Sequence, residues 1–322
     1  MVDLRDFRTL RWSADEGPWS SAASARFAAD GYEALSFQAP RGLKLGTLDF
    51  VRDLPGLRGL SIDAPVLDDS AVNDLAELEY LSLVTGSRKP LAVDRLERLT
   101  SLVVTGRRDL LTIGPLARLC SLVVAGSAGS DMRFLGDKPL LQRLRLDGRP
   151  GHLRLDGLDR CPKLTELLVQ DHQVASLSPL KALTELEQVT LSGPKRLPAD
   201  NDLDLEHLTQ SRDLHRLVLI AAGRIRSLAP LRRLTRLRSV RLDRIAINDS
   251  DLTPLSQLPR WTEVTRPRSS LTELSHRSVP LQASRPSRIT WRTYVAHQLS
   301  DHVVVTVVTV SDVRQSAEGR VV

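Results

Sequence analysis

Residues 78–104 read LEYLSLVTGSRKPLAVDRLERLTSLVV, and this stretch contains one short phrase twice. The phrase is Leu, two residues, Leu or Val, one residue and a third aliphatic residue, at Leu78/Leu81/Leu83 and Leu99/Leu102/Val104. Working outward, the phrase recurs at Leu57/Leu60/Ile62, Leu119/Leu122/Val124, Leu141/Leu144/Leu146, Leu164/Leu167/Val169, Leu186/Val189/Leu191, Leu214/Leu217/Leu219 and Leu237/Val240/Leu242. The middle aliphatic residues, which we call the middle anchors, lie 21, 21, 20, 22, 23, 22, 28 and 23 residues apart. One structural unit is therefore repeated along the chain.

Self-similarity at this period predicts a solenoid of the leucine-rich-repeat type. Each phrase is a short strand, because alternate residues of a strand point to opposite faces and the anchors alternate with other residues. A single repeat cannot bury its own apolar edge, so its neighbours must cover it. The sequence thus predicts an α/β repeat fold with a curved parallel sheet on the concave side and short α or 3₁₀ turns on the convex side. Caps are expected at both ends.

A second signature precedes several strands and predicts how the convex turns begin. A small or hydroxyl residue stands before Pro-Leu at Gly114-Pro115-Leu116, Ser178-Pro179-Leu180, Ala229-Pro230-Leu231 and Thr253-Pro254-Leu255. Proline fits the first turn of a helix, where no N–H partner is needed. Together the two signatures resemble the 22-residue bacterial repeats of the internalin type, over about residues 43–264. Internalins are secreted adhesins, but we expect neither a signal peptide nor a wall anchor in this protein, so the resemblance implies the fold rather than the function.

The strand exits depart from the general repeat pattern. The position five residues after the middle anchor, usually Asn in this family, holds other residues throughout: Pro65, Gly86, Arg107, Ser127, Arg149, His172, Pro194, Ala222 and Ile245. Glycine occurs nearby at Gly86, Gly106, Gly126, Gly148 and Gly193. We expect these glycines to make the bend by adopting positive φ, which glycine does at no steric cost.

Four segments are predicted along the chain. Residues 1–42 form an N-terminal cap that is rich in aromatic residues and ends in a degenerate first repeat at Tyr32/Leu35/Phe37. Residues 43–265 form the solenoid of about ten repeats, in which Trp261/Val264/Arg266 reads as a stop. Residues 266–290 read as a flexible linker, and residues 291–322 as a C-terminal tail. The strand signal 303–310 in the tail either caps the last edge strand or belongs to a poorly ordered tail, and the sequence leaves both open.

The sequence contains little that indicates chemistry. No phosphate-binding glycine loop, zinc-protease motif, Cys-x-x-Cys pair or nucleophile elbow occurs, and the seven histidines are scattered. Cys161 reads as a small buried hydrophobic residue. The insertion 194–208 carries alternate carboxylates that could hold calcium, but a solvated acidic loop is favoured. We expect a non-enzymatic protein without cofactor or metal.

The start of the chain and its composition lead to further expectations about location. Asp3, Arg5, Asp6 and Arg8 interrupt the first residues, and no run of 18 apolar residues occurs. The two cysteines and the formal net charge of +6 suggest no disulfide framework and only a weak preference for polyanions. A soluble, cytoplasmic protein with no membrane association is expected, and its oligomeric state stays open.

The leading functional hypothesis is a protein-interaction scaffold whose concave face binds a protein partner. Several aliphatic residues point outward from the predicted sheet beside charged ones, and a contiguous apolar strip is typical of a contact surface. The alternative is that these valines are only β-formers on a tolerant surface. The predicted partner-binding residues are Tyr80, Val84, Val103, Val123, Arg143, Arg145, Glu166, Leu168, Arg216, Val218 and Arg241.

The second functional hypothesis is binding to nucleic acid or another polyanion. It depends on an arginine cluster within residues 224–244 and on the basic tail, since arginine contacts phosphates. No aromatic residues are interleaved to stack bases, which disfavours single-strand recognition. The cluster consists of Arg224, Arg226, Arg232, Arg233, Arg236, Arg238 and Arg244. The sequence names no partner, and a host-directed or immunity role stays open too.

Overall fold

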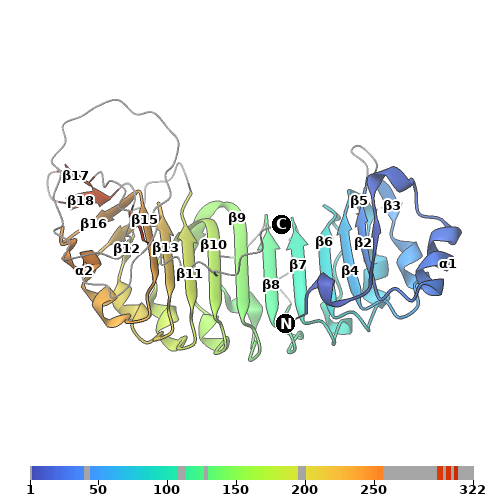
Figure 1. The fold of residues 1–322 in the computed structure, drawn as a ribbon, viewed down its shortest axis with the longest axis horizontal. Coiled ribbons are helices and arrows are strands. Elements are labelled where there is room, and N and C mark those ends of the chain that lie inside the picture. The colour runs from blue at the N-terminus through green and yellow to red at the C-terminus, as the bar shows by residue number, and fades with distance from the viewer. Residues whose placement is uncertain are drawn as a thin grey trace, which may run out of the picture.

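The computed structural model describes residues 2–39, 44–106, 113–126, 130–194 and 201–256, together with the backbone of 296–299, 302–305 and 308–310. Its centre is a curved sheet of 12 strands laid side by side, largely in chain order (Figure 1). The strands in spatial order are β1 (Thr9–Trp12), β2 (Ala34–Gln38), β4 (Gly59–Asp63), β6 (Tyr80–Val84), β7 (Ser101–Thr105), β8 (Ser121–Ala125), β9 (Arg143–Leu153), β10 (Glu166–Val174), β11 (Gln188–Ser192), β13 (Arg216–Ile220), β15 (Ser239–Asp243) and β19 (Val308–Val310).

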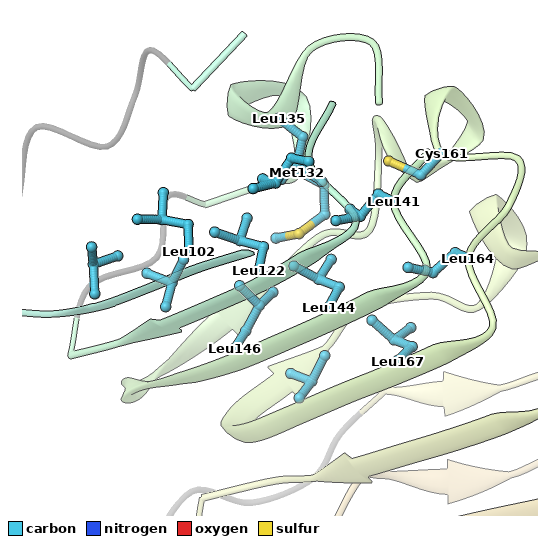
Figure 2. Close-up of a cluster of buried hydrophobic side chains, with 14 of the residues drawn as sticks. Leu102, Leu122, Met132, Leu135, Leu141, Leu144, Leu146, Cys161, Leu164 and Leu167 are labelled. Atoms are coloured by element: carbon cyan, nitrogen blue, oxygen red, sulfur yellow. The ribbon is translucent and has the colours of Figure 1, made fainter. Parts of the chain in front are cut away.

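The nine phrases of the sequence are nine of these strands, from β4 to β15. All pair in parallel, and the middle anchors stand opposite one another, as Leu60 does to Leu81 and Leu144 to Leu167. The anchors are buried almost completely and form one continuous aliphatic core, part of which Figure 2 shows around Leu122. Burying one such leucine contributes about 1.5–3 kcal/mol. The predicted leucine-rich-repeat solenoid is confirmed.

Short turns of helix return the chain along the convex side. Three of the four predicted proline signals begin such a turn, at Ser178, Ala229 and Thr253, whereas Gly114 lies in a turn that is not helical. The return elements are η3 (Asp49–Asp53), η4 (Ser70–Asp74), η5 (Val93–Arg95), η7 (Arg133–Leu135), η8 (Leu158–Arg160), η9 (Ser178–Ala182), η10 (Leu205–Leu208), η11 (Ala229–Arg233) and α2 (Thr253–Ser256).

The N-terminal end of the core is closed by an aromatic cluster and a helix. The cap contains η1 (Leu4–Asp6), η2 (Ala14–Glu16) and α1 (Ser21–Ala29), the last begun by a hydrogen bond from the Ala23 amide to the Ser20 hydroxyl. The ring centroids of Trp12 and Trp19 lie 5.0 Å apart, and those of Trp19 and Phe50 lie 4.9 Å apart. These rings cover the apolar cross-section that a solenoid exposes at its end.

Two smaller ladders run beside the main sheet, one toward each end of the array (Figure 1). One comprises β12 (Asp202–Leu203), β14 (Arg224–Ile225), β16 (Ile245–Ile247), β18 (His302–Val305) and β17 (Ala296–Leu299), and a second pairs β3 (Leu45–Thr47) with β5 (Val66–Asp68). The backbone of β19 pairs antiparallel with β15, and that of β18 with β16. The described parts of the strand signal, residues 303–305 and 308–310, thus pair with the last repeats. The linker 266–290 and the stop at Trp261/Val264/Arg266 lie outside the described residues.

The predicted role of the exit glycines is right at three positions and wrong at two. Gly86, Gly106 and Gly126 have φ of 64°, 70° and 85°. Gly148 and Gly193 do not adopt positive φ, but a Cβ at Gly148 would lie 1.8 Å from Nε2 of His172 and one at Gly193 would lie 2.0 Å from the Ala221 carbonyl oxygen. These two glycines are therefore required by close packing between repeats rather than by φ.

Candidate functional site: the concave face of the sheet

The concave face consists of three rows of outward side chains, because the residues between the anchors point away from the core. The register places each row across successive strands. The first row runs Ala34, Gly59, Tyr80, Ser101, Ser121, Arg143, Glu166, Gln188, Arg216, Ser239; the second row runs Ser36, Ser61, Ser82, Val103, Val123, Arg145, Leu168, Thr190, Val218, Arg241; and the third row runs Gln38, Asp63, Val84, Thr105, Ala125, Asp147, Gln170, Ser192, Ile220, Asp243.

The predicted apolar strip lies mainly in the second row. Val103 and Val123 stand opposite each other and are half-buried, and Leu168 is half-buried two strands further along. Val84, in the third row, is 39% exposed. Val218 is only 6% exposed, so the expectation that it points into solvent is wrong. In the register it stands between Thr190 and Arg241.

The charged residues of the central strands form a network of their own. Nε of Arg143 lies 3.1 Å from a carboxylate oxygen of Glu166, and Nη2 of Arg145 donates a hydrogen bond of 3.0 Å to the Gln170 side chain. Arg241 lies 3.8 Å from Asp243, while Arg216 is exposed. The structure therefore brings most of the predicted residues from Val103 to Leu168 into one patch, which we call the central patch. Arg216 and Arg241 lie beyond it, on β13 and β15.

The first row is partly covered by the start of the chain, a contact that no sequence pattern indicated. The Ser101 hydroxyl donates a hydrogen bond of 2.6 Å to the Val2 carbonyl, and Ser101 is buried. Tyr80 is half-buried; burial raises the pKa of its phenol, and the nearby carboxylate of Asp3 raises it further. Tyr80 and Val84 thus lie on one strand, but only Val84 offers an open apolar side chain.

The arginine cluster is largely paired with acidic residues of the preceding repeat. Arg224 lies 3.2 Å from Asp202, and Arg226 lies 3.3 Å from Asp204. Arg233 pairs with Glu206, Arg236 pairs with Asp213, and Arg232 donates to the Thr253 hydroxyl. The acidic insertion, expected to be a solvated loop, therefore supplies partners for three of these arginines. Arg238 and Arg244 are exposed and make no ion pair with the described residues.

Other polar groups inside the array have structural surroundings. Cys161 is fully buried, as expected, and burial raises the pKa of its thiol to about 11 (Figure 2). Lys138 is also fully buried, and its ammonium group donates a hydrogen bond of 3.0 Å to the Gly114 carbonyl oxygen. Within the described ranges no three His, Cys, Asp or Glu side chains are grouped so that they could hold a metal.

The convex side has one hollow of about 770 Å³ among the described elements η7, η8 and η9. Arg133, Arg160 and Lys181 line it together with Asp156 and Asp159, so its charges are mixed. No helix in the described part of the chain has the length and apolar character needed to span a bilayer. On the concave face, the central patch combines the half-buried side chains of Val103, Val123 and Leu168 with charged neighbours.

Solved structures with this arrangement share little sequence with the chain. An internalin (inlF) from Listeria monocytogenes str. 4b F2365 is 16% identical, with a TM-score of 0.57 over 80% of this chain and 80% of the other. The plant peptide hormone receptor RGFR1 in complex with RGF2 is 16% identical, with a TM-score of 0.53 over 73% of this chain and 43% of the receptor chain. This chain thus spans less than half of the receptor's length. No protein-family model and no curated protein matches. The likeness shows a common leucine-rich-repeat fold.

Proposed function

We propose that this leucine-rich-repeat solenoid is a non-enzymatic scaffold in the cytoplasm that binds a protein partner on the central patch of its concave face. The observation that carries the proposal is the set of aliphatic side chains Val103, Val123 and Leu168 in the second row, with Arg145 between the last two. Such a surface supplies hydrophobic contact together with orienting charges. One structure with this fold is a peptide hormone receptor in complex with RGF2, which supports a protein or peptide ligand.

The charges around the patch support a partner of mixed charge rather than a polyanion. Arg143 is compensated by Glu166, and Arg145 has Asp147 at 3.8 Å. Exposed ion pairs of this kind contribute about 0–1 kcal/mol each, so a partner can exchange them at little cost. Selectivity would then come from the position of its own charges against these pairs.

The proposal is tested by capture of a partner from the native cytosol with the full chain as bait. Capture is measured at low and at high salt after nuclease treatment, with the wild type beside the triple variant Val103→Asp, Val123→Asp and Leu168→Asp. The variant should retain the wild-type circular dichroism and melting temperature within a few degrees and lose at least ten-fold of the captured partner, because three carboxylates replace the apolar contact.

A control variant places carboxylates on apolar surface elsewhere. Leu67 and Leu140 are 71% and 39% exposed and lie off the concave face, so Leu67→Asp with Leu140→Asp should capture as the wild type does. Arg145→Glu, which leaves the apolar strip intact, should reduce capture more at low salt than at high salt. Undiminished capture by the folded triple variant would show that the partner binds another surface.

A further inference from the structure

The first seven described residues follow an unusual path across the sheet. β1 is the edge strand of the main sheet. Residues 2–8, which precede β1 in the chain, cross the starts of β2, β4, β6 and β7, and we call this segment the strap. In Figure 1 the N-terminus lies beside the starts of β7 and β8, far from the N-terminal helix α1. The strap therefore lies over the first row of the concave face, roughly perpendicular to the strands.

Two apolar side chains fix the middle of the strap to the sheet. A Cβ on Gly59 would lie 3.0 Å from Cδ2 of Phe7 and 3.2 Å from Cδ1 of Leu4, so both side chains rest on the bare backbone of β4. The guanidinium of Arg58 lies 5.3 Å from the centre of the Phe7 ring, a distance at which a cation is attracted to the ring. The absence of a side chain at Gly59 thus creates the seat that Leu4 and Phe7 fill.

Polar contacts shape the strap and tie down its end. The Asp3 amide donates to the Asp6 carboxylate at 2.7 Å and the Arg5 amide donates to the Asp3 carboxylate at 3.0 Å, which closes the turn η1. The Thr9 hydroxyl donates to the Leu4 carbonyl at 2.9 Å, and Ser101 donates to the Val2 carbonyl. The side chain of Arg5 is 90% exposed. The strap therefore uses its apolar residues against the sheet and its charged ones toward solvent.

We propose that the first row over β4, β6 and β7 is a track for a short peptide with one turn, and that the strap is its intramolecular occupant. The strap sequence repeats Asp, an apolar residue and Arg twice, at residues 3–5 and 6–8. A partner peptide that competes for the track carries two apolar side chains three residues apart, each between an acidic and a basic residue. The track is next to the central patch, since Ser101 and Val103 lie on the same strand.

This inference rests on the proposed use of the concave face, but its test needs no natural partner. The probe is a fluorescein-labelled peptide of residues 2–9, VDLRDFRT, titrated into the full-length chain. In the variant Leu4→Asp the strap loses the contact over Gly59 and leaves the track, so the peptide should bind at least ten-fold more tightly than to the wild type. A peptide with the same Leu→Asp change should not bind, and Ser101→Arg added to Leu4→Asp should abolish binding by obstructing the track.

Two outcomes would overturn the inference. Binding of the peptide to neither chain, with the circular dichroism of Leu4→Asp unchanged, would mean that the strap is a fixed part of the cap. Equal binding to wild type and Leu4→Asp would mean that the peptide binds elsewhere. If Leu4→Asp fails to fold, Thr9→Val replaces it, since this change removes only the hydrogen bonds to the strap carbonyls. If the central-patch variant loses partner capture but the peptide binds neither chain, the proposed function stands and only the peptide track is refuted.

Discussion

At the scale of single residues, the core tolerates one ammonium group in a column of leucines. The position three residues before the first anchor holds Leu96 and Leu116 in two repeats, Lys138 in a third and Ser211 in a fourth. Both polar residues are fully buried. Lys138 bonds the carbonyls of Gly114 and Asp137, and Ser211 bonds that of Leu183 at 2.7 Å. Desolvation opposes the charge, and burial lowers the pKa of Lys138 accordingly.

Lys138→Met should therefore stabilise the protein. Methionine keeps the unbranched stem in the core and removes the desolvated charge, and Gly114 is exposed enough for its carbonyl to bond water. The free energy of unfolding in urea should rise by about 1 kcal/mol. Ser211→Ala is the contrasting control and should lower it by about 1 kcal/mol, because the Leu183 carbonyl is then buried without a donor. A lowered value for Lys138→Met would mean that the carbonyl bonds outweigh the burial of the charge.

His172 should make the stability depend on pH. His172 is only 6% exposed, and neither ring nitrogen has a hydrogen-bond partner among the described residues. Burial lowers the pKa of its imidazole, although the nearby carboxylates of Asp171 and Asp147 raise it to a smaller extent. The unfolded chain therefore binds a proton near pH 6.5 that the folded chain binds only at lower pH. The contribution of His172 to stability is complete above pH 6.5 and is lost as the pH drops toward the folded pKa.

The measurement is the free energy of unfolding between pH 7.5 and 5 for the wild type and for His172→Phe. The difference between the two curves isolates this residue, because the surface carboxylates are common to both chains. Relative to His172→Phe, the wild type should lose stability as the pH falls below 6.5. His152→Asn, a change at an exposed histidine, should follow the wild type. Parallel curves for wild type and His172→Phe would contradict the assignment.

At the scale of elements, the strand exits are held by contacts between neighbouring repeats. The His172 ring on β10 covers Gly148 on β9, so Gly148→Ala should destabilise the fold by about 2 kcal/mol through overpacking. His172→Ala vacates the space, and the double variant should lose at least 1 kcal/mol less than the sum of the two changes in a urea double-mutant cycle.

Two other glycines provide the controls for this cycle. Gly193→Ala should lower the free energy of unfolding as much as Gly148→Ala does. No side-chain substitution should restore it, since the added Cβ would meet the backbone carbonyl oxygen of Ala221. Gly46→Ala should be nearly neutral, because no atom lies within 4 Å of the added Cβ. Additive costs for Gly148→Ala and His172→Ala would show that the two residues do not share the space.

The exits also show where reasoning from the sequence stops. The phrase predicted the nine strands of the main sheet from β4 to β15, because the aliphatic anchors repeat at one phase and only one register buries all of them. It did not predict β5, β12 and β14, which belong to the smaller ladders. The same residue type, however, is needed for different reasons: Gly106 adopts a positive φ, whereas Gly148 leaves room for the His172 ring. The sequence of one repeat cannot distinguish these two reasons, because the packing reason depends on which atoms of the next repeat lie against the glycine. Asp171 adopts a φ of 57° at an exit without any glycine.

At the scale of the whole molecule, the prediction of a concave binding face depended on periodicity and missed what lies across the rows. Outward positions such as Val103 and Val123 could be assigned by phase alone. The strap could not, since it joins Val2 to Ser101 across 99 positions of sequence. Leu4 and Phe7 beside a glycine in the first row are a signal only once the strand register is known. Ion pairs between repeats were hidden for the same reason, because their spacing follows the repeat rather than a helix.

Pairing between repeats also decides how the molecule should meet polyanions. Arg52 pairs with Asp74, Arg98 with Glu77, and Arg226 with Asp204, so acidic and basic stretches that look separate in the sequence compensate each other in space. The neighbouring carboxylates lower the net positive charge of the arginine cluster, so fewer counterions should be released from phosphates than the arginines alone would suggest. Heparin retention of the full chain should be weak and should be lost well below physiological ionic strength.

Any retention that occurs should be carried by the arginines without ion pairs to described residues. Arg238→Ala with Arg244→Ala should lower the eluting salt concentration clearly, whereas Arg226→Ala with Arg233→Ala should change it little, because those two guanidinium groups already face carboxylates of Asp204 and Glu206. The slope of the logarithm of affinity against the logarithm of salt should be correspondingly shallow, near two released counterions or fewer. A steep slope that falls with Arg226→Ala and Arg233→Ala would instead mean that a polyanion breaks the inter-repeat pairs, and the polyanion hypothesis would then replace the scaffold.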